Sequence, residues 1–122
     1  MSADGKAREL EAEVRSVDSI RILSITGEID MASAPRFQSA VDEALLDQPA
    51  TLVVDLSRVE FFGSAGLSVL LVAAEAVPEG QLRVVASTPV RRPIEVTGLD
   101  KLLSVYNSVD DALAVAQPRR PA

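Results

Sequence analysis

The hydrophobic and polar positions change their period several times along the chain, and each change predicts a new element. Apolar residues alternate with polar ones over residues 10–17 and again over 20–26, which predicts an edge strand and a second strand joined by a tight turn. Gly27 is expected to end the second strand. A continuous apolar run over residues 51–54, reaching Leu56, predicts a strand that is covered on both faces.

Helical spacing appears between the predicted strands. Ser33 and Pro35 begin a helix, with the serine as its cap and the proline in the first turn. Apolar residues then recur at helical spacing up to Leu45. Residues 64–77 are apolar on nearly every side, so this second helix is expected to be deeply packed.

The last third of the chain continues the alternation of strands and helices. It predicts a strand from residue 82, a short helix between residues 88 and 97, a short strand over 102–106 and a helix that follows Ser108. Gly98 is expected to end the short helix, and Pro93 implies that this helix either starts near Arg91 or is kinked. Strands that alternate with helices imply an α/β fold with a mixed, mostly parallel sheet. We expect a sheet of 4–5 strands with about four helices.

The chain length fits one domain. Of 122 residues, 48% are hydrophobic, which is enough for an aliphatic core. The patterned region spans residues 10–116, and we expect the polar segment 1–9 and the proline-rich segment 117–122 to be flexible tails.

Composition excludes several classes of function. The chain has no cysteine and no histidine, so it has neither the thiol nor the imidazole of the common nucleophilic catalytic centres. We therefore expect no enzyme activity, no metal site and no cofactor, and we interpret Asp55 as a structural turn residue. The net charge of −6 without a basic stripe argues against nucleic acid as a partner. The sequence has no apolar run of about 18 residues and no apolar core of a signal peptide at its start, so we expect a cytoplasmic protein with no membrane partner.

Residues 55–67 form the most informative segment. They predict a buried strand that ends near Asp55, a following loop that contains Glu60, a turn through Gly63 and a helix that begins at Ser64. Serine is a preferred helix cap, and a serine at that position is also a site where a phosphate group would add about −1.5 to −2 charges. The residues alone leave the structural and the regulatory interpretation open. The glycines lack the flanking residues of a phosphate-binding loop, so they are expected to serve the turn and close helix packing.

Two further positions are ambiguous from the residues alone. Of Phe61 and Phe62, one is expected to pack under the second helix and the other to be free for an interface. Asp30 either ends a strand and shapes the following loop, or faces a partner.

Four segments of the chain resemble a known family when they are taken in order. They are Gly27-Glu28-Ile29-Asp30, the segment 55–67, Gly98-Leu99 and Ser108-Val109-Asp110-Asp111-Ala112-Leu113. Their order is similar to that of a STAS domain and, more narrowly, to that of the bacterial anti-sigma factor antagonists. The resemblance runs from about residue 12 to residue 116 and implies a STAS-like fold.

The resemblance also implies a mechanism. In that family, the unphosphorylated protein binds an anti-sigma factor that is also a serine kinase, and this binding releases a sigma factor. Phosphorylation of one serine ends the binding, and a metal-dependent serine phosphatase restores it. Carried onto this chain, the phosphorylated residue is Ser64, and the partner surface comprises Asp30, Phe62, Gly63, Ser64 and Ala65. The chain departs from the family where Gly63 replaces a common aspartate and Ala65 replaces a second serine or threonine.

Other functions remain as alternatives. A STAS scaffold subunit of a larger signalling or transport complex would use Ser64 only as a cap. A small enzyme or nucleotide-binding domain is disfavoured because histidine, cysteine and a phosphate-binding loop are lacking. We expect a monomer or a weak dimer.

Overall fold

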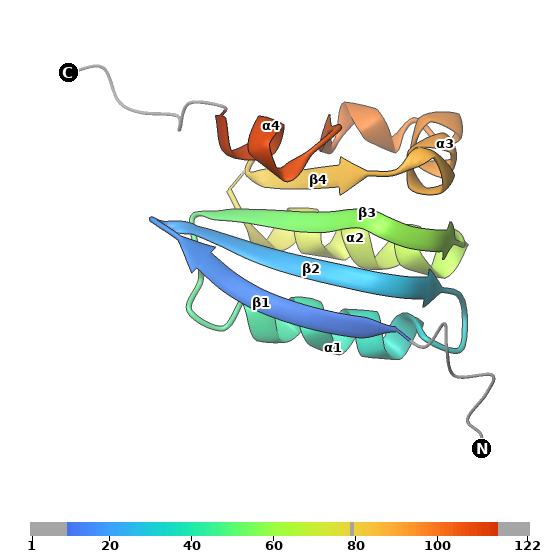
Figure 1. Cartoon of the computed structure of the whole chain (residues 1–122), viewed down its shortest axis with the longest axis horizontal. Helices are drawn as coiled ribbons and strands as arrows, with labels where there is room; N and C mark the ends of the chain where they lie inside the picture. Colours follow the sequence, from blue (N-terminus) through green and yellow to red (C-terminus); the bar gives the residue numbers. More distant parts are fainter. Residues whose placement is uncertain (1–9, 79, 115–122) are drawn as a thin grey trace.

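A computed structural model describes residues 10–78 and 80–114 (Figure 1). The expected flexible tails, 1–9 and 117–122, lie outside the described residues, as do residues 115 and 116 at the end of the predicted domain. The elements, in chain order, are β1 (Glu11–Val17), β2 (Ile20–Ile29), α1 (Ala34–Ala44), β3 (Thr51–Phe62), α2 (Ser64–Ala76), β4 (Leu82–Ala86), α3 (Thr88–Val96), the 3-10 turn η2 (Leu99–Lys101), β5 (Ser104–Tyr106) and α4 (Val109–Ala114).

The five strands form one sheet in the order β1-β2-β3-β4-β5. β1 pairs with β2 in the antiparallel sense, and every other neighbouring pair is parallel. This arrangement confirms the prediction of a mixed, mostly parallel α/β sheet. β1 lies at one edge of the sheet and the short β5 lies at the other, with α1 and α2 behind the sheet as Figure 1 is drawn.

The two faces of the sheet are covered unequally. On one face, α1, α2 and α3 bury a continuous core with the alternate side chains of β2, β3 and β4. On the other face, α4 covers a smaller cluster in which Ala112 packs on Ile22, Val53 and Val85. The central strands therefore have apolar residues on both faces, as the continuous run over 51–54 predicts.

Two strands are longer than predicted. β2 continues through Gly27 to Ile29, because Gly27 adopts a φ of 105° at a point where the pairing between β2 and β3 shifts its register. β3 continues beyond Leu56 to Phe62, where its second half pairs with the second half of β2. The predicted end of β2 at Gly27 and the predicted loop before Gly63 were therefore wrong.

Turn residues after α3 act as predicted. Gly98 follows this helix with a φ of 79°, a conformation that favours glycine. Pro93 lies inside α3 rather than at its beginning, because the helix starts at Thr88. The Ser108 hydroxyl accepts a hydrogen bond of 3.0 Å from the amide of Asp111 and so caps α4.

Candidate functional site

The predicted site residues lie where β2 and β3 end side by side. Ile29 is paired with Phe62, and the amide of Gly63 donates a hydrogen bond of 2.9 Å to the carbonyl oxygen of Ile29. Asp30 follows Ile29 and Ser64 follows Gly63. The sheet therefore brings the loop after β2 next to the beginning of α2, although 34 positions separate the two residues in the sequence.

Ser64 is the first residue of α2 and is exposed. The residue that caps this helix is Gly63, so the interpretation of Ser64 as the cap was wrong. Within the described part of the chain, the Ser64 hydroxyl makes no hydrogen bond. The side chain is therefore free for chemistry at the surface.

Gly63 does not form the expected tight turn. Its φ of −92° and ψ of −179° are extended, and residues with side chains adopt this conformation freely. A Cβ atom at this position would lie 3.3 Å from a ring carbon of Phe61. The missing side chain therefore leaves room for that ring beside the start of α2.

Gly66 does serve close helix packing, as expected. A Cβ atom there would lie 2.6 Å from a ring carbon of Phe62 and 2.9 Å from Cγ2 of Ile29. Phe62 packs edge-on against Phe37, with ring centroids 6.5 Å apart. The ring of Phe62, at the end of β3, therefore packs against both α1 and α2.

The two phenylalanines divide their roles. Phe62 is only 4% exposed and lies under α2, while Phe61 is 50% exposed. Phe62, which we expected on the partner surface, has a buried side chain. The aromatic ring that reaches solvent is Phe61, and Met31 in the loop after β2 is 84% exposed. Sequence reasoning did not single out Met31, because a lone methionine in a loop carries no pattern.

Asp30 is held in one orientation by the residues that follow it. Its carboxylate accepts a hydrogen bond of 2.9 Å from the amide of Ser33. The carboxylate also lies 3.2 Å from the Ser33 hydroxyl, whose single proton has a shorter acceptor in the carbonyl oxygen of Glu28, at 2.8 Å. The hydroxyl of Ser33 also accepts a hydrogen bond of 3.0 Å from the amide of Asp30. Ser33 begins α1 as predicted, but its hydroxyl bonds backwards into the loop instead of capping the helix.

This network stabilises the charged form of Asp30. The amide of Ser33 is the main cause that lowers the pKa of Asp30, with the Ser33 hydroxyl adding to it and partial desolvation opposing it. Asp30 is therefore anionic at neutral pH, as an ordinary aspartate is, and keeps its charge further into acid. It gives the loop both a shape and a negative charge beside α2.

The beginning of α2 is suited to an anion. The first turn contains no acidic side chain, and the amides at the start of a helix have no carbonyl partner within the helix. A phosphate group on Ser64 would meet these amides and would not need to enter the core. Ala65, the remaining predicted site residue, is partly buried in the same turn and carries no hydroxyl.

Because the chain has no histidine and no cysteine, aspartate and glutamate are the side chains considered as metal ligands. Among the described residues, no three of them come together in a group that could hold a metal ion. No helix in this part of the chain is long and apolar enough to cross a membrane.

The model of the STAS domain family matches residues 11–112, and the chain belongs to this family. Its relatives include the anti-sigma-F factor antagonist RsfB of Mycobacterium tuberculosis, which is 42% identical over 98 residues that cover 79% of this chain and 80% of RsfB.

Solved structures agree with this assignment. An anti-sigma factor antagonist from Mycobacterium paratuberculosis aligns with a TM-score of 0.82 at 41% identity and covers 88% of this chain and 93% of that one. The unphosphorylated form of the anti-sigma factor antagonist SpoIIAA aligns with a TM-score of 0.62 at 17% identity. This alignment covers 88% of this chain and all of that one. The phosphorylated form of SpoIIAA, from Bacillus, aligns with a TM-score of 0.60 at 14% identity. This alignment covers 84% of this chain and 96% of that one. At these identities the SpoIIAA structures show the fold alone.

Proposed function

We propose that the protein is an anti-sigma factor antagonist, and that phosphorylation of Ser64 switches off its binding. The observation that carries the proposal is the placement of an exposed, unbonded serine hydroxyl at the start of α2. The names of its relatives support the partner class and favour the antagonist over a scaffold subunit.

In this proposal the partner is an anti-sigma factor that also has serine kinase activity, and a serine phosphatase reverses the modification. The exchange takes place in the cytoplasm, through protein contacts and without catalysis by this chain. The partner covers the surface formed by Asp30, Met31, Phe61 and Ser64. Two of these residues are exposed apolar anchors, a kind of residue that contributes strongly to interfaces.

Phosphorylation acts on the interface and leaves the fold intact. The free amides of α2 favour a phosphate by about 0.3–1 kcal/mol at an exposed site. The same group places about −1.5 to −2 charges beside the anionic Asp30 loop. A partner surface that accommodates a small hydroxyl would have to accept both the bulk and the charge, and binding should fail.

The proposal is tested with variants of Ser64 used as bait in the native lysate. Ser64→Ala should retain a kinase-like partner even when Mg-ATP is added, because no phosphate can form. Ser64→Asp should lose that partner. Ser68 lies one turn further on the exposed side of the same helix, and Ser68→Ala is the matched control that should behave as the wild type. If both Ser64 variants retain every partner of the wild type with and without Mg-ATP, the switch does not operate at Ser64.

A further inference from the structure

β1 presents an open strand edge that is unusually well matched to itself. It is the outermost strand of the sheet, and none of the described residues pairs with its outer side (Figure 1). All seven of its residues are exposed. An edge strand of this length carries a row of unpaired amides and carbonyls, which is a template for pairing with another strand.

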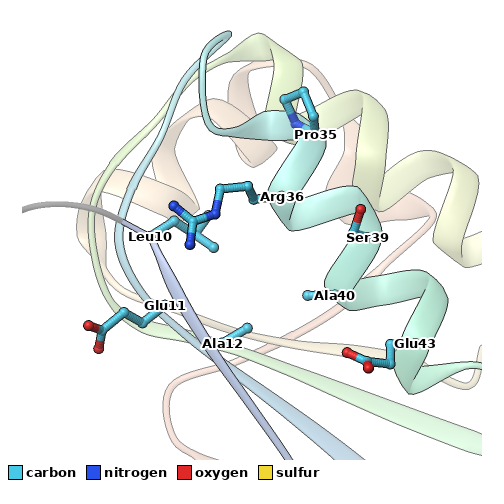
Figure 2. A pocket seen from close by; sticks show the side chains of 8 residues that line it. All are labelled: Leu10, Glu11, Ala12, Pro35, Arg36, Ser39, Ala40 and Glu43. Atoms are coloured by element: carbon cyan, nitrogen blue, oxygen red, sulfur yellow. The ribbon is translucent and has the colours of Figure 1, made fainter.

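The two faces of β1 are distinct and open. Leu10 and Ala12 point towards α1 and line a hollow beside it, while Glu11 points away from the helix (Figure 2). Glu11, Glu13 and Arg15 line a second hollow on the opposite face of the sheet. α1 lies behind β1 and lines the hollow on that face, whereas no described strand occupies the outer edge. A second strand could therefore approach that edge in the plane of the sheet.

The sequence of β1 is complementary to itself in an antiparallel pairing. When two copies align with Val14 opposite Val14, each Glu13 lies opposite the Arg15 of the other copy. Directly opposed side chains in an antiparallel pair share one face and contact each other, and opposite charges stabilise the pair. The symmetric arrangement forms this ion pair twice.

The two registers centred on the neighbouring charged residues are less favourable. A shift that centres the pairing on Glu13 forms two Glu11–Arg15 pairs but brings the two Glu13 carboxylates together at the centre, a repulsion that the Val14 register avoids. A shift that centres the pairing on Arg15 brings two guanidinium groups together and forms no ion pair between Glu13 and Arg15. Neither Glu13 nor Arg15 forms an ion pair with any other residue that the structure describes. Both side chains are therefore available to a second copy.

We infer that β1 is a self-association edge, through which two copies pair antiparallel about Val14 and join their sheets. The occupant is a second copy of this chain, because the charges of β1 complement β1 itself. One strand pair buries less than a standard interface of about 1,600 Å², so the dimer should be weak. It should form at protein concentrations of roughly 0.1–1 mM.

Charge exchange tests the register. In sedimentation equilibrium of the full chain, the wild type should dimerise over this range. Glu13→Arg alone and Arg15→Glu alone should each weaken the dimer by about tenfold or more, since each creates two like-charge pairs. An equimolar mixture of these two variants should restore association, because each strand then complements the other. Glu75→Arg makes the same charge change at an exposed position of α2 and should leave association unchanged.

Cysteine crosslinking tests whether the two Val14 residues lie opposite each other. The chain has no cysteine, so a single Val14→Cys substitution introduces the only thiol. Two such thiols would lie opposite each other, and dissolved oxygen in aerated buffer should oxidise them to a disulfide-linked dimer. Val17 has an exposure of 37% against 41% for Val14, but in this register its counterpart is Glu11. Val17→Cys should therefore crosslink about tenfold more slowly.

A wild type that stays monomeric at about 1 mM would overturn the inference. Equal association of all the charge variants, failure of the mixture to restore it, or equal crosslinking at Val14 and Val17 would each overturn the proposed register.

Discussion

Replacing Gly66 with alanine should destabilise the protein, although alanine favours helices. The new Cβ would lie 2.6 Å from the Phe62 ring and 2.9 Å from Ile29, and ordinary contacts begin near 3.4 Å. The ring is buried and packs edge-on against Phe37, which restricts how far it can move away from Gly66. Overpacking costs about 1–3 kcal/mol, and contacts as short as these place the cost in the upper half of that range, at about 2–3 kcal/mol.

The intrinsic preference of helices for alanine over glycine offsets about 1 kcal/mol of that cost. We therefore expect Gly66→Ala to lower the free energy of unfolding by about 1–2 kcal/mol. The melting temperature of a domain of this size should fall by about 4–8 °C.

Chemical denaturation with circular dichroism measures this change. Ser68→Ala, in the same helix and exposed, is the control and should stay within about 0.5 kcal/mol of the wild type. Phe62→Leu combined with Gly66→Ala should be less destabilised than the sum of the two single changes, because the smaller side chain relieves the clash. A Gly66→Ala variant as stable as the wild type would refute the packing argument.

The neighbouring phenylalanines and Asp30 give two further predictions. Phe61→Ala should change stability by less than about 0.5 kcal/mol and should reduce the yield of the kinase-like partner recovered from lysate. Phe62→Ala should lose about 3–5 kcal/mol of stability in the same denaturation assay. The reverse pattern would contradict the assignment of Phe61 to the surface and Phe62 to the core. Asp30→Asn should be less stable than the wild type at pH 7. Because the pKa of Asp30 is lowered in the folded state, its contribution is present above the unfolded value of 3.8 and is lost as the pH falls through the lowered pKa. The stability difference, measured by urea denaturation across pH, should therefore vanish in acid, and a constant difference would contradict the role of the carboxylate.

Much of the fold could be predicted because its signals are local. The alternation of apolar and polar residues identified the strands, and Gly98 and Ser108 marked real helix ends. The residues between Leu56 and Gly63 misled the prediction, because their polar side chains resemble a loop. Their strand structure depends on pairing with β2, which is not a local property.

The details of the site depend on the same pairing. Because Ile29 accepts a hydrogen bond from Gly63, Gly63 remains extended and becomes the cap that we had assigned to Ser64. The pairing of Ile29 with Phe62 also decides which phenylalanine is buried. The burial of Arg83 in the sheet also depends on a contact between segments that are distant in the sequence. It is only 2% exposed and donates a hydrogen bond of 2.7 Å to the carbonyl oxygen of Ala112, because α4 covers it.

The central claim is that Ser64 is a phosphorylation switch for a protein partner. Its most direct test is intact-mass measurement and phosphopeptide mapping of the tagged protein recovered from its native lysate, with and without added Mg-ATP. The co-purifying proteins are identified in both samples. We predict one phosphate, on Ser64, together with an ATP-dependent loss of a kinase-like partner. An unphosphorylated Ser64 with an unchanged set of partners would contradict the claim.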